Sequence, residues 1–126
     1  MTYTKEEYSK KALENEQFAT NLPGTIPGIE WAITAQFYAA LHYVNAYFAT
    51  KGEHYSGHPT RLRAIQKDSW LSVIYDDYQG LYNISRDARY ECMNLGNEEL
   101  LFAQKKLHLI KMRYLPVFVM LSKKPG

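Results

Sequence analysis

The residues best suited to chemistry form a polar cluster, Ser85-Arg86-Asp87-Ala88-Arg89-Tyr90. It follows an amphipathic stretch in which Leu71, Ile74, Tyr75, Tyr78, Leu81, Tyr82 and Ser85 share one helix face. An arginine at the buried edge of a helix bundle costs desolvation energy unless it is paired. The partners of Arg86 and Arg89 can be carboxylates of the same fold or a phosphate group. The sequence alone leaves both interpretations open.

A second candidate group surrounds the start of a short helix. His54 and His58 lie in the loop before Pro59, and Arg61 follows. The free backbone N–H groups of a helix N-terminus, together with a guanidinium and an imidazole, can bind a phosphate. His58 can equally be a capping residue that binds no ligand.

A third candidate is His42, which shares a polar stripe with Tyr38 and Asn45. A lone histidine on an aromatic helix face is more often a satisfied core residue than a catalyst. The chain has no Gly-rich phosphate loop, no His-Glu-x-x-His motif, no Glu-x-x-His pair and no Gly-x-Ser-x-Gly motif. The single Cys92 is interpreted as a partly buried structural thiol. We therefore expect no metal site and no cofactor.

The apolar spacing predicts an all-α, up-down bundle of four long helices plus one short helix. The long helices are expected at about residues 4–21, 29–50, 71–92 and 97–121, and the short helix at about residues 59–67. There is no period-2 strand pattern and no internal repeat. We expect a single domain over residues 1–126, with its core at about residues 4–121.

Local signals predict several helix ends and interactions. The first helix should begin with a capping box of Thr4 and Glu7, beside the staple pair Tyr3 and Tyr8. Other N-caps are expected at Asp68 or Ser69 and at Asn97. The aromatic second helix should be central in the bundle or contribute to a subunit interface. The last helix has a long apolar seam, and Pro116 should kink or end its regular hydrogen bonding nearby; the seam residues are Leu100, Ala103, Leu107, Ile110, Tyr114, Val117 and Leu121.

Composition indicates an ordinary globular protein, because 46% of the 126 residues are hydrophobic and 22% are charged. A single cysteine, an N-terminus without an apolar signal core and the lack of a long apolar run favour a cytoplasmic protein without membrane contact. Charge is uneven, since all 13 acidic residues lie at or before Glu99 and six Lys/Arg follow it. The basic last helix could face phosphates or an acidic partner, or be a solvated face.

Three segments in this order resemble HEPN-domain proteins of bacteria and archaea: Trp31–His42, His58–Arg61 and Ser85–Tyr90. The resemblance extends over about residues 4–121. It implies a bundle of four to five helices that forms a homodimer with a polar cleft at the dimer interface. Many members are metal-independent ribonucleases in toxin–antitoxin, antiviral or RNA-processing systems. Others are binding modules, often beside a small nucleotidyltransferase.

The catalytic motif of this family is an Arg, often followed by a polar residue, with a His after four to six intervening residues. Arg86-Asp87 resembles its start, but residues 91–93 are Glu, Cys and Met. The resemblance therefore implies a catalytically degenerate, dimeric module that binds nucleotide or RNA, with a nucleotidyltransferase-type protein as a candidate partner in a toxin–antitoxin or defence system. The candidate phosphate-binding residues are His58, Arg61, Ser85, Arg86, Arg89 and Tyr90.

Two alternatives stay open. In the first, the protein is an active metal-independent ribonuclease. Such cleavage needs a base, an acid and a cation, so His42 or His58 would have to approach Arg86 or Arg89 in space. In the second, the protein is a structural interaction module whose aromatic second helix and basic last helix each cover a protein partner.

Overall fold

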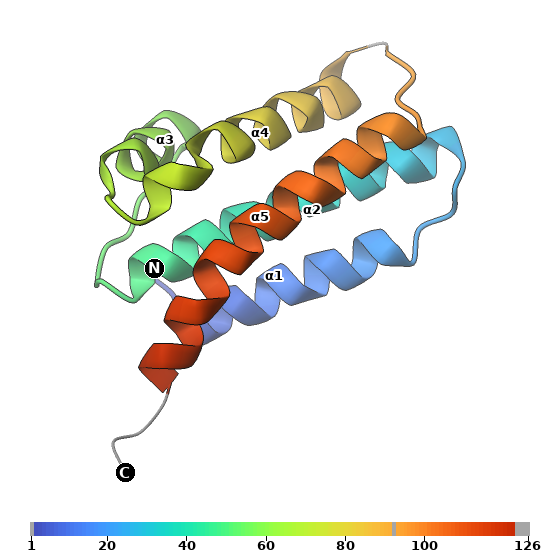
Figure 1. Cartoon of the computed structure of the whole chain (residues 1–126). Helices are drawn as coiled ribbons and strands as arrows, with labels where there is room; N and C mark the ends of the chain where they lie inside the picture. Colours follow the sequence, from blue (N-terminus) through green and yellow to red (C-terminus); the bar gives the residue numbers. More distant parts are fainter. Residues whose placement is uncertain (1, 92, 123–126) are drawn as a thin grey trace.

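The computed structural model describes residues 2–91 and 93–122. Every regular element in this range is a helix: α1 (Lys5–Thr20), α2 (Ile26–Ala49), α3 (His58–Lys67), the 3-10 helix η1 (Leu71–Ile74), α4 (Tyr75–Tyr90) and α5 (Asn97–Ser122). Figure 1 shows the four long helices running alternately in opposite directions, with the short α3 at one end of α4. The predicted all-α bundle of four long helices and one short helix is confirmed.

The aromatic helix α2 is the central helix of this bundle. It packs against α1, α4 and α5, and most of its residues are buried. Fully buried alanines, such as Ala39, Ala40 and Ala46, let the neighbouring helices approach closely. The larger rings fill the space between helices, since Phe37 packs against Tyr78 of α4. Of the two predicted placements for this helix, the central one is therefore found.

The seam of α5 matches the prediction over most of its length. Ala103, Leu107, Ile110 and Tyr114 are buried, whereas Leu121 is 49% exposed and lies outside the core. The helix passes through Pro116 and continues to Ser122, so the proline does not end it. In Figure 1 the C-terminal turns of α5 run at a steeper angle than those before them, as expected where a proline removes one backbone donor.

The N-terminal capping signals of α1 are confirmed. The Thr4 hydroxyl accepts a hydrogen bond from the Glu7 N–H, and the Glu7 carboxylate accepts one from the Thr4 N–H, both at 3.1 Å. The rings of Tyr3 and Tyr8 meet edge-on with their centroids 5.7 Å apart. Together these contacts fix the direction in which the chain enters α1.

Other helix boundaries differ from the prediction for local reasons. The second helix starts at Ile26 rather than residue 29, because Thr25 caps it and Pro27 is tolerated in its first turn. Asp68 does not cap α4 as predicted, because α4 begins only at Tyr75 with Ile74 at its N-cap position. The Asp68 carboxylate instead accepts a hydrogen bond from the Leu71 N–H at the start of the 3-10 helix η1. At α5, Asn97 is the first helical residue and not the N-cap.

None of the helices described within residues 2–91 and 93–122 is long and apolar enough to cross a membrane. In the same residues, no three His, Cys, Asp or Glu side chains gather closely enough to hold a metal ion. Cys92, for which we predict a partly buried thiol, lies outside the described residues.

Candidate functional site

The middle of α2, the start of α3 and the C-terminal half of α4 meet on one side of the bundle. The ring of Phe37 on α2 lies 5.5 Å from the ring of Tyr82 on α4, measured between centroids. The imidazole of His58, the first residue of α3, stacks on the same Tyr82 ring at 3.4 Å. These contacts bring together the polar side chains that we call the arginine surface: Tyr38, His58, Tyr82, Arg86, Arg89 and Tyr90.

Arg89 is held in place by neutral partners. Its guanidinium donates hydrogen bonds to the carbonyl and the hydroxyl of Ser85, both at 3.2 Å, and to the hydroxyl of Tyr38 at 3.0 Å. Its central carbon lies 5.6 Å from the centre of the Tyr38 ring and 5.2 Å from that of Tyr90. The side chain is thus oriented, while its charge and further N–H donors stay available to a ligand.

Arg86 is the more exposed of the two arginines. Its guanidinium carbon lies 5.9 Å from the ring centres of both Tyr82 and Tyr90, which are one helical turn before and after it. Within the part of the chain that the structure describes, neither Arg86 nor Arg89 forms an ion pair with a carboxylate. The carboxylate network that the sequence left open as an interpretation is therefore not found there.

Ser85 orients the site but does not face solvent. The residue is fully buried, its hydroxyl donates to the Tyr82 carbonyl at 2.7 Å, and the same hydroxyl accepts from Arg89. Its burial agrees with its predicted place on the apolar stripe of the fourth helix. Ser85 is one of the residues predicted to bind phosphate. Its burial instead makes it a positioning residue that orients Arg89.

Arg61 turns inward from α3 instead of facing solvent at the helix N-terminus. It is only 7% exposed, and its guanidinium donates to the side-chain oxygen of Asn45 at 3.1 Å and to the backbone oxygen of Tyr55 at 3.3 Å. Gly57 occupies the N-cap position of α3, and no side chain caps the helix. His58 is therefore not the capping residue, which was one of its two predicted roles.

The pKa values of His42 and His58 are both lowered, and Arg61 contributes to both shifts. Burial lowers the pKa of His58, and the charges of Arg61 and Arg86 lower it further. Burial also lowers the pKa of His42, with additional effects of Lys11 and Arg61. Arg61 therefore lies close enough to both imidazoles to disfavour their protonation, and both are neutral at neutral pH.

Only one of the two histidines belongs to the arginine surface. His58 shares the Tyr82 ring with Arg86, whereas the His42 ring stacks on Tyr8 of α1, with centroids 6.3 Å apart. His42 also lines a pocket of about 490 Å³ between α1 and α2. Its Nδ1 is buried without a hydrogen-bond partner among the described residues, so it is not the satisfied core histidine that its position predicts.

The other candidate residues, His54 and the lysines of α5, do not belong to the arginine surface. His54 is exposed and lines a separate hollow of about 250 Å³. On the basic helix α5, Lys106 pairs with Asp77 and Lys111 pairs with Glu16, each at 3.0 Å. Much of the positive charge of α5 thus balances acids of the fold itself, and residues 123–126, with the last two lysines, lie outside the described residues.

Sequence reasoning missed the central position of Tyr82 in the site. It assigned this ring to the apolar stripe, whereas the structure shows that both His58 and Arg86 contact it. The available signal is the spacing of four that joins Tyr78, Tyr82, Arg86 and Tyr90, because residues four apart are neighbours on a helix surface. The hydrogen bond between Tyr38 and Arg89 has no such signal, since it joins two different helices.

A scan against models of known protein families finds no match, and a search of curated protein sequences finds no significant match either. What the site can do must therefore be judged from its own residues. Guanidinium groups without carboxylate partners, placed beside tyrosine rings, are suited to binding a phosphate together with a stacked base.

Proposed function

We propose that the arginine surface binds RNA or a nucleotide. The observation that carries this proposal is that Arg86 and Arg89 lie among tyrosine rings and have no carboxylate partner in residues 2–91 and 93–122. A guanidinium binds phosphate oxygens through paired, charge-assisted hydrogen bonds. The residues Tyr38 and Tyr90 are 39% and 68% exposed, so bases can stack on their rings.

Single-stranded RNA fits this surface better than a duplex does. Stacking on a protein ring requires a base whose face is free, which a duplex does not offer. The exposed tyrosines flank the arginines at ring-to-guanidinium distances of 5.2–5.9 Å. A chain of unpaired nucleotides could therefore place phosphates on the guanidinium groups and bases on the neighbouring rings.

The HEPN family assignment is part of the same proposal. In it the chain forms a homodimer, binds RNA or nucleotide without catalysis, and has a nucleotidyltransferase-type protein as a second partner in a toxin–antitoxin or defence system. Exposed apolar side chains on α5 support a protein contact: Leu101, Leu109, Met112, Val119 and Met120. Sedimentation of the purified protein at tens of micromolar, about the range of weak dimers, tests the homodimer.

The RNA-binding proposal is tested by fluorescence anisotropy with a labelled single strand of about 12 nucleotides. We expect Arg86→Ala to weaken binding about tenfold, because it removes a charged contact with phosphate. It should also lower the slope of log affinity against log salt by about 0.7 between about 50 and 200 mM salt. Tyr90→Leu should weaken binding but leave the slope unchanged, since stacking releases no counterions.

Lys105→Ala is the matched control, because Lys105 is an exposed cation on α5 that takes part in no ion pair with a described residue. It should leave both affinity and slope close to those of the wild type. The Arg86 side chain is exposed and donates no hydrogen bond to a residue that the structure describes, so its loss should not disturb folding. Wild-type protein that binds no RNA, or that binds it equally well after Arg86→Ala, would reject the proposal.

A second candidate function, metal-independent ribonuclease activity, is favoured by one observation. The His58 ring centre lies 3.4 Å from the centre of the Tyr82 ring and the Arg86 guanidinium carbon lies 5.9 Å from it, so a candidate base and a phosphate-binding cation lie near each other. Labelled single-stranded RNA incubated with EDTA tests it. Activity should be lost in His58→Ala and kept in His42→Ala, because His42 lies toward α1; cleavage that survives His58→Ala rejects the assignment.

A further inference from the structure

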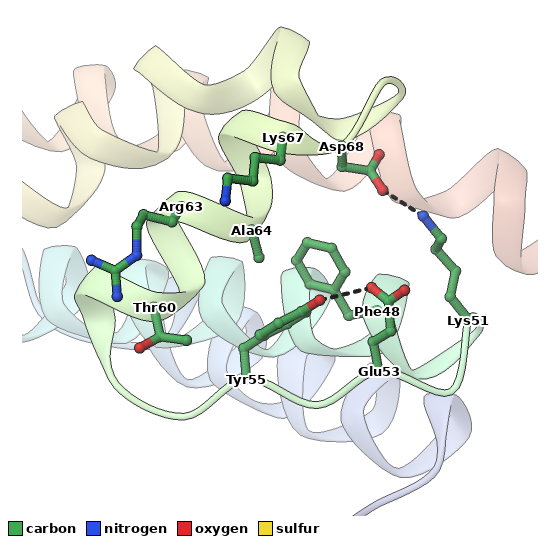
Figure 2. Close-up of a pocket in the computed structure, with 9 residues that line it drawn as sticks. All are labelled: Phe48, Lys51, Glu53, Tyr55, Thr60, Arg63, Ala64, Lys67 and Asp68. Carbon is green, nitrogen blue, oxygen red and sulfur yellow. Dashed lines mark hydrogen bonds and ion pairs between the residues drawn. The ribbon is translucent and has the colours of Figure 1, made fainter.

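Helix α3 has a second face that carries different chemistry from the arginine surface. Thr60, Arg63, Ala64 and Lys67 recur at spacings of three and four and line one wall of a groove of about 410 Å³ (Figure 2). This volume falls within the range of small-molecule sites, about 300–1,000 Å³. We call it the α3 groove. Arg61, one position after Thr60, points into the bundle instead.

Both carboxylates of the α3 groove already have protein donors. Asp68 accepts hydrogen bonds from Lys51 at 2.8 Å and from the hydroxyl of Tyr47 at 2.7 Å. Glu53 accepts one from the hydroxyl of Tyr55 at 3.0 Å. Figure 2 shows the Lys51–Asp68 and Tyr55–Glu53 contacts as the two dashed lines in the groove. The charge of Asp68 is therefore balanced by Lys51, whereas Glu53 is hydrogen-bonded by a neutral hydroxyl and keeps its negative charge.

Besides Glu53, the remaining charged side chains of the groove are the cations Arg63 and Lys67, so positive charge is in excess. Arg63 and Lys67 are exposed, and neither forms an ion pair with any residue that the structure describes. They are four residues apart on one helix face, so both side chains can reach the same phosphate group. The hydroxyl of Thr60, one turn before Arg63, adds a neutral donor on that face.

Two aromatic rings form the apolar part of the groove. Phe48 is buried and meets the half-buried Tyr55 edge-on, with their centroids 4.9 Å apart. Figure 2 shows both rings between the Arg63 side chain and the Lys51–Asp68 pair. A phosphate held by Arg63 would thus carry its organic group toward an aromatic wall, against which a flat ring can pack.

We propose that the α3 groove binds a nucleoside monophosphate. Arg63 and Lys67 hold the phosphate with the help of Thr60, and the base packs against Tyr55. The site is separate from the arginine surface, because the two share no residue. A phosphate without a base uses only the cations, so it binds more weakly than the nucleotide.

The proposal is tested by calorimetric titration of the full chain at low salt with AMP, ribose 5-phosphate and inorganic phosphate. We expect AMP to bind more tightly than either of the others. The double variant R63Q/K67Q should lose at least about tenfold in AMP affinity, because two charge-assisted contacts are removed. Lys105→Gln, a change at an exposed cation outside both sites, should stay within about twofold of the wild type.

The variants at Arg63 and Lys67 replace exposed side chains, and thermal unfolding followed by circular dichroism verifies that each variant is folded. The proposal is overturned if wild-type protein does not bind AMP, or if ribose 5-phosphate or inorganic phosphate binds as tightly as AMP. It is also overturned if AMP affinity is unchanged in R63Q/K67Q, or if it falls as far in Lys105→Gln. AMP binding that persists when the arginine surface fails to bind RNA leaves this site intact and rejects only the RNA proposal.

Discussion

Asp68 connects groups from three parts of the chain, so its replacement should have a large effect on stability. The residue is 7% exposed, and its carboxylate accepts hydrogen bonds from Tyr47 at 2.7 Å and from Lys51 at 2.8 Å. It also accepts from the backbone N–H groups of Trp70 at 3.0 Å and Leu71 at 2.8 Å. The end of α2 is in this way joined to the start of η1.

Asp68→Ala should lower the free energy of unfolding by about 3–4 kcal/mol. The buried Tyr47 hydroxyl loses its acceptor, which costs about 1–3 kcal/mol, and the lost cap of η1 costs about 0.5–2 kcal/mol. The Lys51 side chain is 46% exposed, so its ion pair adds only about 0–1 kcal/mol. Asp68→Asn keeps a neutral acceptor for these donors and should cost about 1 kcal/mol.

The effect of Asp68→Asn should depend on pH. Burial raises the pKa of Asp68, but the Lys51 ammonium and the hydrogen bonds from Leu71, Tyr47 and Trp70 outweigh burial and hold the pKa below its usual value. A carboxyl group with a lowered folded pKa contributes stability above its unfolded pKa, and this contribution is lost as the pH falls through the folded pKa. The stability difference between wild type and Asp68→Asn should therefore shrink below about pH 4.

Urea denaturation followed by circular dichroism measures these differences at about pH 7 and about pH 3. Asp76→Ala is a suitable control, because Asp76 is an exposed acid in the first turn of α4. It should cost less than about 1 kcal/mol, the usual size of a helix-dipole contribution. A cost below about 1 kcal/mol for Asp68→Ala, or a difference for Asp68→Asn that stays constant with pH, would refute the reasoning.

Two further predictions concern the histidines and the glycine in α4. Arg61→Met should raise the pKa of both His42 and His58, because the Arg61 charge lowers both, whereas Arg86→Ala should raise only the pKa of His58. NMR titration of the imidazole protons measures the two pKa values separately. If neither pKa changes in Arg61→Met, the placement of Arg61 near both rings is contradicted. Gly80→Ala places a new Cβ 3.3 Å from the tip of the Phe102 ring on α5. This ring is exposed and can therefore move. The better helix propensity should then raise the unfolding free energy by up to about 1 kcal/mol in urea titrations, and a clear loss would show that the ring cannot move.

The helices could be predicted because burial leaves its period in the sequence. The capping box of Thr4 and Glu7 and the buried seam from Ala103 to Tyr114 are both found as expected. The start of α2 could not be predicted as well, because Pro27 suits either a loop or the first turn of a helix. The structure decides between them through the Thr25 cap, whose hydroxyl accepts from the Gly28 N–H at 3.3 Å.

The candidate site was less predictable, because it depends on how different helices face each other. Residue types alone singled out Arg86, Arg89 and His58, and the structure brings these three around Tyr82 and Tyr90. The sequence could not show that His42 lies toward α1, or that Arg61 turns inward. Both outcomes depend on contacts between residues far apart in the chain, for which helical periodicity carries no information.

Arg61 links the fold to the chemistry of the arginine surface. A buried guanidinium costs several kcal/mol of desolvation, and Arg61 donates hydrogen bonds to neutral oxygens of Asn45 and Tyr55. Its charge and that of Arg86 disfavour protonated His58, which stacks on the neutral Tyr82 ring. A bound phosphate brings negative charge to the same place and so favours protonated His58.

Because binding and protonation are reciprocally linked, a ligand that favours protonated His58 must bind more tightly when protons are more available. RNA affinity should therefore increase as the pH falls from about 7 to about 6, approaching the lowered pKa of His58 from above. The increase should disappear in His58→Gln and remain in His42→Gln, because His42 packs on α1 instead of the arginine surface. An increase that survives His58→Gln would mean that the phosphate does not lie near this imidazole.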